Sequence, residues 1–230
     1  MTSKPLHSLR LEDDDIDFLV ELEERFCIQI TDEETQKLYT VGQLFDLITN
    51  KLKGVGGSKC SSMITFHKLR NALQKHVGKV ILRPSTLIDS LSEYTPKQLH
   101  EKIQTSCDLR VPTPYFSRAA YIGVLICIAS TCSAFPIIFL SNSFWPLLGI
   151  TLVTFIGGAL LAHSNKGVWG EDQETLGDIA RKMTLLNYGA LVMQSAKSDE
   201  ESIWKTIINT IDDIIDLREN VIIDHSTRLL

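Results

Sequence analysis

Charge is absent from one long stretch of this chain of 230 residues. Residues 119–165 contain no Asp, Glu, Lys or Arg. The stretch holds two apolar runs, 119–140 and 144–163, separated by the polar residues 141–143. A bilayer core about 30 Å thick needs about 20 helical residues to cross it, and a backbone in hydrocarbon must satisfy its own hydrogen bonds. The two runs therefore predict a transmembrane helical hairpin, and the alternative is a buried hairpin in a soluble core.

Clustered cysteine and histidine are also missing. The five cysteines and six histidines are scattered and form no Cys-x-x-Cys or His-x-x-x-His spacing. This excludes a disulfide framework or a metal site of familiar spacing and indicates reduced, packing cysteines. No nucleophile–base pair and no glycine-rich phosphate loop is visible, so we expect no catalytic residue, no metal and no enzyme activity. No apolar run follows Met-Thr-Ser-Lys-Pro, so no secretory signal peptide is expected.

The charges that are present are divided among three blocks. Residues 1–57 carry 6 basic and 12 acidic side chains, a net charge of −6; residues 58–118 carry 10 and 4, net +6; and residues 164–230 carry 7 and 12, net −5. Basic residues flank the hairpin and none lies in its turn, which predicts cytoplasmic flanks on both sides. The basic block has three readings: contact with anionic headgroups, contact with the acidic flanks, or simple surface solvation.

Periodic apolar residues predict several short helices around the hairpin, and thus an all-α fold. One helix begins near Asp15, and its apolar stripe consists of Ile16, Leu19, Leu22 and Phe26. Thr31 and Glu34 form a capping-box pattern, Thr40 caps a helix that stops at Gly54, and residues 54–62 read as a flexible linker. In the basic block, Thr95 with Pro96 predicts a helix start.

The C-terminal block predicts two amphipathic helices. The first covers residues 176–191, with a kink expected at residues 187–189. The second begins at a capping-box pattern of Ser198 and Glu201. Its apolar face consists of Ile203, Trp204, Ile207, Ile208, Ile211 and Ile215.

Residues 18–48 resemble the second half of an acyl carrier protein. The matching phrases are Leu22–Phe26 (LEERF), Ile30–Glu34 (ITDEE) and Thr40-Val41, in the family's order and spacing. The resemblance implies an acidic recognition helix that docks basic partner proteins. The residues expected to bind such a partner are Glu12, Asp13, Asp14, Asp17, Glu21 and Glu24.

The serine that carries 4′-phosphopantetheine in such carriers is missing here. The family spacing places Glu12 at that position, and a glutamate cannot form the phosphodiester. The family's first helix has no room upstream, but residues 215–221 resemble its end and residues 226–230 resemble the following loop. We therefore expect the two ends of the chain to pair as complementary halves; the alternative is that they dock elsewhere or on another protein.

The basic block offers an alternative attachment site at Ser90. Residues 63–118 are weakly similar to a carrier's helix–loop–helix order and contain a literal Asp89-Ser90-Leu91. Residues 85–91, however, fit the loop before the modified serine better, which puts Thr95 at the attachment position. The surroundings are also basic, whereas carriers are acidic there.

The sequence thus predicts a two-pass bacterial inner-membrane protein with both termini in the cytoplasm. The expected segments are 1–53 (carrier helices two and three), 54–62 (linker), 63–118 (basic), 119–163 (hairpin) and 164–230 (tail resembling helix one). Their predicted function is a non-enzymatic interaction scaffold with no cofactor, and nucleic acid is not an expected partner. The alternative is a membrane-anchored carrier bearing 4′-phosphopantetheine on Ser90; a pore-forming hairpin is the third hypothesis. Three glycines would permit a homo-oligomer: Gly149, Gly157 and Gly158.

Overall fold

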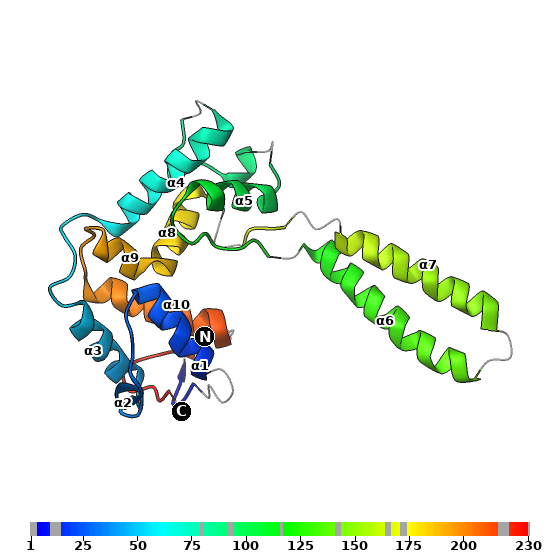
Figure 1. Cartoon of the computed structure of the whole chain (residues 1–230), viewed down its shortest axis with the longest axis horizontal. Coiled ribbons are helices and arrows are strands. Elements are labelled where there is room, and N and C mark those ends of the chain that lie inside the picture. The colour runs from blue at the N-terminus through cyan, green and yellow to red at the C-terminus, as the bar shows by residue number, and fades with distance from the viewer. Residues whose placement is uncertain are drawn as a thin grey trace. The chain divides into compact units, whose positions relative to one another are not determined.

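The computed structural model shows a mostly helical chain (Figure 1). It describes residues 4–9, 15–78, 81–91, 94–115, 117–140, 144–163, 167–170, 174–215 and 221–229. The elements are β1 (Lys4–Pro5), α1 (Asp15–Phe26), α2 (Asp32–Thr35), α3 (Val41–Leu52), α4 (Ser61–Val77), the 3-10 helix η1 (Ile88–Leu91), α5 (Pro96–Ser106), α6 (Arg118–Leu140), α7 (Phe144–His163), α8 (Leu176–Leu186), α9 (Tyr188–Met193), α10 (Glu200–Ile215) and β2 (Val221–Ile222). The predicted helical class is confirmed.

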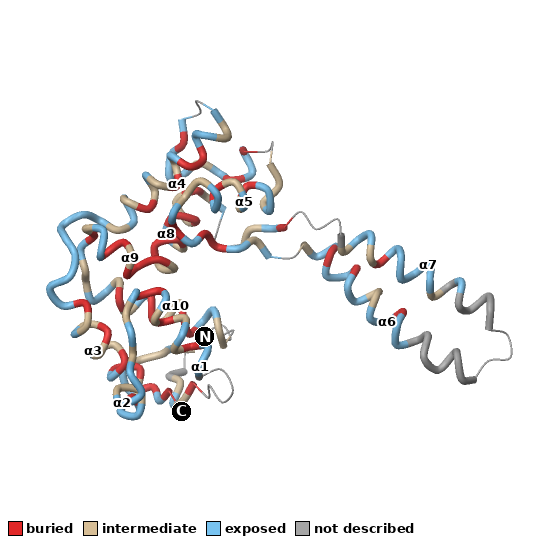
Figure 2. Tube along the Cα trace, in the orientation of Figure 1, coloured by how far each residue is buried: buried red, intermediate tan, exposed pale blue. Residues whose placement is uncertain are grey.

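The chain divides into two compact units. Unit 1 consists of Met1–Thr86, Ile103–Pro112 and Thr175–Leu230, and unit 2 consists of Leu87–Lys102 and Thr113–Glu174. Unit 1 is therefore built from three separate stretches of the chain, whereas unit 2 contains the hairpin. Figure 2 shows α8 and α9 largely buried and the described part of α6 and α7 largely exposed.

The core of unit 1 is centred on α1. Phe18, Leu22 and Phe26 recur at helical spacing and are each at most 1% exposed, and α1 packs against α9 and α10. The Phe26 ring meets the Tyr188 ring edge-on with centroids 5.8 Å apart. A Cβ on Gly189 would lie 1.9 Å from the Phe26 carbonyl oxygen. Only glycine permits this close approach of α9 to the end of α1.

Capping boxes fix the starts of three helices in unit 1. They are Thr31 with Glu34 at α2, Thr40 with Gln43 at α3, and Thr175 with Asp178 at α8. At α10 the predicted capping residue, Ser198, is wrong by one position. The Ser202 N–H donates to the Asp199 carboxylate at 2.9 Å, so Asp199, and not Ser198, caps the helix. The Tyr188 hydroxyl bonds the Asp199 backbone N–H and C=O and thereby positions the cap.

The C-terminal tail is part of the same core. β2 pairs in parallel with β1. The N–H groups of Val41 and Gly42, in the first turn of α3, donate to the Thr227 and His225 carbonyls at 2.9 and 3.0 Å. These are N–H groups that a helix cannot satisfy itself, so the far end of the chain completes this helix. The His225 ring also stacks on Trp204 of α10 at 4.4 Å. The two ends of the chain are thus paired in one unit.

The expected linker is hydrogen-bonded to the segment after α9. The Gly57 N–H donates to the Ala196 carbonyl at 2.9 Å, and the Lys197 N–H donates to the Lys59 carbonyl at 2.8 Å. The expected kink also occurs, because α8 ends at Leu186 and α9 begins at Tyr188. The Asn187 side chain donates to the Met183 carbonyl at this break.

Unit 2 contains the hairpin, whose helices lie within one residue of the predicted runs. Tyr115 and Val168 exchange backbone hydrogen bonds of 2.8 and 2.9 Å at the base of the hairpin. Between the helices, a Cβ on Gly158 would lie 2.8 Å from the Gly123 carbonyl oxygen. The close contact between α6 and α7 at this point thus depends on small residues. Gly158 packs against α6 within the hairpin and so does not face a second copy of the chain.

Judged on its described residues, neither α6 nor α7, nor any other helix, combines the length and hydropathy that a membrane crossing requires. The helical hairpin is therefore present, while its predicted transmembrane character is not supported by this criterion.

Candidate functional site

The acidic helix α1 presents its charges on the side opposite its buried stripe. Asp17 is exposed, and no ion pair forms on it within the described part of the chain. Glu24 has a side chain that is 59% exposed, and that of Glu21 is 22% exposed. The other three expected partner-binding residues, Glu12, Asp13 and Asp14, lie outside the described residues.

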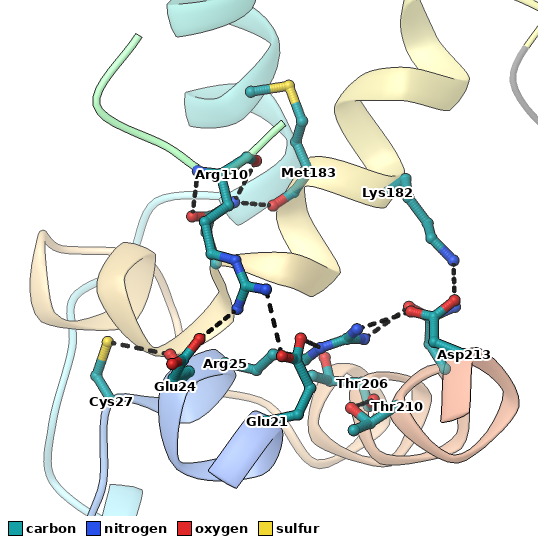
Figure 3. A network of polar contacts seen from close by, with 12 residues as sticks. Glu21, Glu24, Arg25, Cys27, Arg110, Lys182, Met183, Thr206, Thr210 and Asp213 are labelled. Carbon is teal, nitrogen blue, oxygen red and sulfur yellow. Dashed lines mark hydrogen bonds and ion pairs between the residues drawn. The ribbon is translucent and has the colours of Figure 1, made fainter. Parts of the chain in front are cut away.

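An arginine from the basic block binds two of these acids. Arg110 donates to Glu24 at 3.0 Å and to Glu21 at 3.2 Å (Figure 3). Its backbone is held at both ends by Asn187, whose carboxamide accepts from the Arg110 N–H at 2.8 Å and donates to the Arg110 carbonyl at 2.9 Å. One of the three readings of the basic block, contact with the acidic flanks, is thus realised at Arg110.

Arg25 extends the network into the core. Arg25 is only 3% exposed. Its guanidinium donates to the side-chain oxygens of Glu21 at 2.6 Å, Asn209 at 3.0 Å and Asp213 at 2.7 Å. Asp213 also accepts from Lys182 at 2.7 Å. A buried charge is tolerated only when it is paired and hydrogen-bonded, and here α1, α8 and α10 supply the pairing groups.

The network is electrically neutral, because three carboxylates (Glu21, Glu24 and Asp213) face three cations (Arg25, Arg110 and Lys182). Glu21 is thus shared by two arginines and is committed to the fold. Outside this network, Asp17 is an exposed carboxylate of α1 without an ion pair among the described residues, whereas Glu24 is exposed but already paired with Arg110.

Sequence reasoning missed Arg25, although a signal was present. Arg25 stands three residues after Leu22 and seven after Phe18, which places it on the buried face of α1. A charged residue at such a position indicates a buried ion pair. Its partners Asn209 and Asp213 could not be inferred, because they come from the other end of the chain.

Another ion pair of unit 1 joins α4 to the segment after α5. The Lys68 ammonium donates to both carboxylate oxygens of Asp108, at 2.8 and 3.0 Å. This contact lowers the pKa of the Asp108 carboxyl below its usual range.

Ser90 lies in η1 and is exposed. Its hydroxyl donates to the Leu87 carbonyl. Thr95 instead caps α5, as expected, where its hydroxyl accepts from the Gln98 N–H at 3.4 Å. Among the described residues, no group of His, Cys, Asp and Glu side chains could hold a metal ion.

Comparison with family models, curated proteins and solved structures finds no match to this chain.

Proposed function

We propose that this chain is a non-enzymatic, two-pass membrane protein whose paired ends form an acyl-carrier-like interaction module on the cytoplasmic side of a bacterial inner membrane. The hairpin anchors the module, and the acidic face of α1 docks a basic surface of a partner protein. The observation that carries this proposal is the apolar outer surface of the hairpin.

The outward side chains of the hairpin are apolar where the structure describes them. Val153 is 70% exposed, Leu160 66% and Ile128 53%. Apolar area costs about 25 cal/mol per Å² when it stays in water, and patches of this kind mark membrane or protein contacts. Bilayer hydrocarbon would remove that cost for these exposed side chains.

The described residues alone fall short of a membrane span, but the helices themselves are long enough. α6 has 23 residues and α7 has 20. At 1.5 Å per residue they extend about 34 and 30 Å, which matches a hydrocarbon core of about 30 Å. These lengths, together with the absence of charged residues from 119–165, support a hairpin that spans a bilayer.

The module is proposed to dock proteins rather than to carry acyl groups. Glu12, at the family's attachment position, has no hydroxyl to esterify. Asp17 remains available on α1 for a basic partner, and Glu24 is exposed and could exchange its Arg110 contact for one with that partner. Charge complementarity of this kind favours fast, specific docking. The proposed role is to hold a partner at the membrane surface.

Membrane association of the full chain under an alkaline carbonate wash tests the anchor. The wild type should stay with the membrane pellet. Leu125→Arg/Val153→Arg, which charges the outer face of the hairpin, should shift the chain out of the pellet. Asn71→Arg/Gln74→Arg adds the same charge to the exposed face of α4 and should change nothing. Release of the wild type by the wash would refute the anchor.

A second candidate function, the membrane-anchored carrier, is favoured by the exposure of Ser90. Intact-protein mass spectrometry after co-expression with a broad-specificity phosphopantetheinyl transferase separates the two. The scaffold proposal expects an unmodified mass. A phosphopantetheinyl mass increase that vanishes in Ser90→Ala would establish the carrier instead.

A further inference from the structure

Unit 2 contains a cavity of about 580 Å³ that the proposed function does not use. It lies between η1 and the segment that follows α7. The lining residues that matter for its chemistry are Leu87, Ile88, Asp89, Val168, Trp169 and Glu174. Its volume falls in the range of about 300–1,000 Å³ typical of small-molecule sites.

Two carboxylates, those of Asp89 and Glu174, line this cavity. The Ile88 N–H donates to the Glu174 carbonyl at 3.0 Å, which brings Asp89 and Glu174 to the same wall. Both residues are exposed, and no described side chain pairs with either carboxylate. Among the described residues, no lysine, arginine or histidine lines the cavity. The site therefore offers negative charge to a ligand.

The rest of the lining is aromatic and apolar. Trp169 is half-buried and lines the cavity. Its indole N–H is shielded from solvent and has no hydrogen-bond partner in the described structure; as a donor it does not contribute to binding an ammonium group, so the ring face is the part of Trp169 that matters here. Leu87 and Val168 are 54% and 47% exposed. An indole ring beside carboxylates is the composition that recognises organic ammonium groups, because the ring face and the carboxylates both attract a cation.

We propose that this cavity binds the ammonium headgroup of an amphiphile, specifically an aminophospholipid. Val168 follows the end of α7 by five residues and Tyr115 precedes α6 by three, so the cavity wall is close in the chain to both ends of the hairpin. The choice of a lipid as the source of the ammonium group rests on the proposed membrane anchor, whereas recognition of the ammonium group does not.

The test uses the full chain in a nonionic maltoside detergent, which carries no ammonium group. The readout is the ¹⁵N–¹H indole resonance of Trp169, assigned by its loss in Trp169→Phe. Titrants are glycerophosphoethanolamine and a short-chain phosphatidylethanolamine, with the matching phosphatidylglycerol as the headgroup control. We expect saturable shifts with the two amines and none with phosphatidylglycerol.

Variants that remove only the charge test the carboxylates. Asp89→Asn/Glu174→Gln should weaken phosphatidylethanolamine binding about tenfold or more, because it removes the charge-assisted hydrogen bonds to the ammonium group. Glu33→Gln/Asp46→Asn removes two exposed carboxylates of unit 1 and should leave binding unchanged.

The two amine titrants separate the source of the ligand from the chemistry of the site. Binding of both amines with loss in the double variant supports the proposal even if the carbonate wash extracts the chain. Binding of glycerophosphoethanolamine alone would overturn the lipid as source. Equal shifts with phosphatidylglycerol, or equal affinity in the charge-removed variant, would overturn ammonium recognition itself.

Discussion

Unit 1 and the hairpin of unit 2 differ in which kinds of residue lie inside and which face outward. In unit 1, Phe18, Leu22 and Phe26 of α1 are buried, and the carboxylates of this helix face outward or enter an ion-pair network. Ile16, which was predicted on the same apolar stripe, is instead 69% exposed. In the hairpin, small or hydroxyl-bearing residues such as Gly158 and Ser130 lie between the helices, while the side chains of Val153 and Leu160 face outward. The first arrangement suits water, and the second suits a solvent as apolar as leucine.

The difference shows what holds each region together. Burial of apolar area drives the packing of unit 1. If the hairpin lies in hydrocarbon, as proposed, that force is absent between its helices. Close backbone contact and the Ser130–Thr154 hydrogen bond of 3.0 Å would then contribute more to its stability. Four experiments, in order of decreasing expected effect, test this contrast.

Gly189→Ala should have the largest effect, because its Cβ would meet the Phe26 carbonyl oxygen at 1.9 Å and force α9 away from α1. We expect unit 1 to lose about 4 kcal/mol of unfolding free energy, measured by denaturant titration followed through near-UV circular dichroism. Gly149→Ala, whose Cβ would meet nothing within 4 Å, is the matched control and should not destabilise. Similar stability of both variants would show that α9 does not pack so tightly.

Arg25→Ala should cost about 3 kcal/mol, since it leaves Glu21 and Asp213 without their buried partner. Arg110→Ala removes a cation that binds the same Glu21 from a half-exposed position and should cost only about 0.5 kcal/mol. Both values follow from the same denaturation experiment. Equal losses would mean that burial of Arg25 does not decide the strength of the network.

Adjacent glycines of α7 provide a matched pair inside the hairpin. Gly158→Ala places a Cβ 2.8 Å from the Gly123 carbonyl oxygen, whereas the Cβ of Gly157→Ala meets nothing within 4 Å. We expect Gly158→Ala to weaken the helix pair by about 1–2 kcal/mol and Gly157→Ala to be neutral. Energy transfer between dyes on α6 and α7 during an SDS titration measures the pairing. A larger effect at Gly157 would place the helix contact on another face.

The smallest expected effect is the pH-dependent contribution of the Lys68–Asp108 pair to the free energy of unfolding. Because the pKa of Asp108 is lowered in the fold, its contribution is present above the ordinary aspartate pKa and disappears as the pH falls through the folded value. An NMR titration of the carboxyl carbon should show Lys68→Met raising this pKa towards the ordinary value. Since Asp108 is 65% exposed, stability should change by less than about 0.5 kcal/mol. An unchanged pKa in Lys68→Met would contradict the assigned cause.

Local sequence patterns predicted the helices well. The caps at Thr31, Thr40 and Thr95 and the break at Asn187 follow from side chains that bond their own neighbouring backbone. Hydropathy alone located both hairpin helices to within one residue. These signals are contained in a few adjacent residues, so no tertiary information was needed to read them.

Contacts between distant segments were harder to predict. The resemblance led to the expectation that the ends pair, but the bonds from the tail to Val41 and Gly42 depend on how the tail crosses α3. Arg110 and Asp213 lie far from Glu21 and Arg25 in sequence, and no local pattern connects them. The partner-binding role of the acidic face stays a prediction, although Glu21 is already committed within the chain.

The central claim is that the hairpin lies in a bilayer with both ends of the chain on one side. Its most direct test is labelling by a membrane-impermeant maleimide in sealed vesicles of either orientation. Cys60 is exposed and its pKa is lowered by a hydrogen bond with Ser62, so it should react readily, as should a cysteine introduced by Lys197→Cys.

Cys132 supplies the decisive comparison, because it is exposed on α6 yet should be shielded by lipid. The account predicts that Cys60 and the residue 197 thiol react only in inside-out vesicles and that Cys132 reacts in neither orientation until detergent is added. Labelling of Cys132 in intact vesicles, or labelling of the other two thiols from opposite sides, would contradict it.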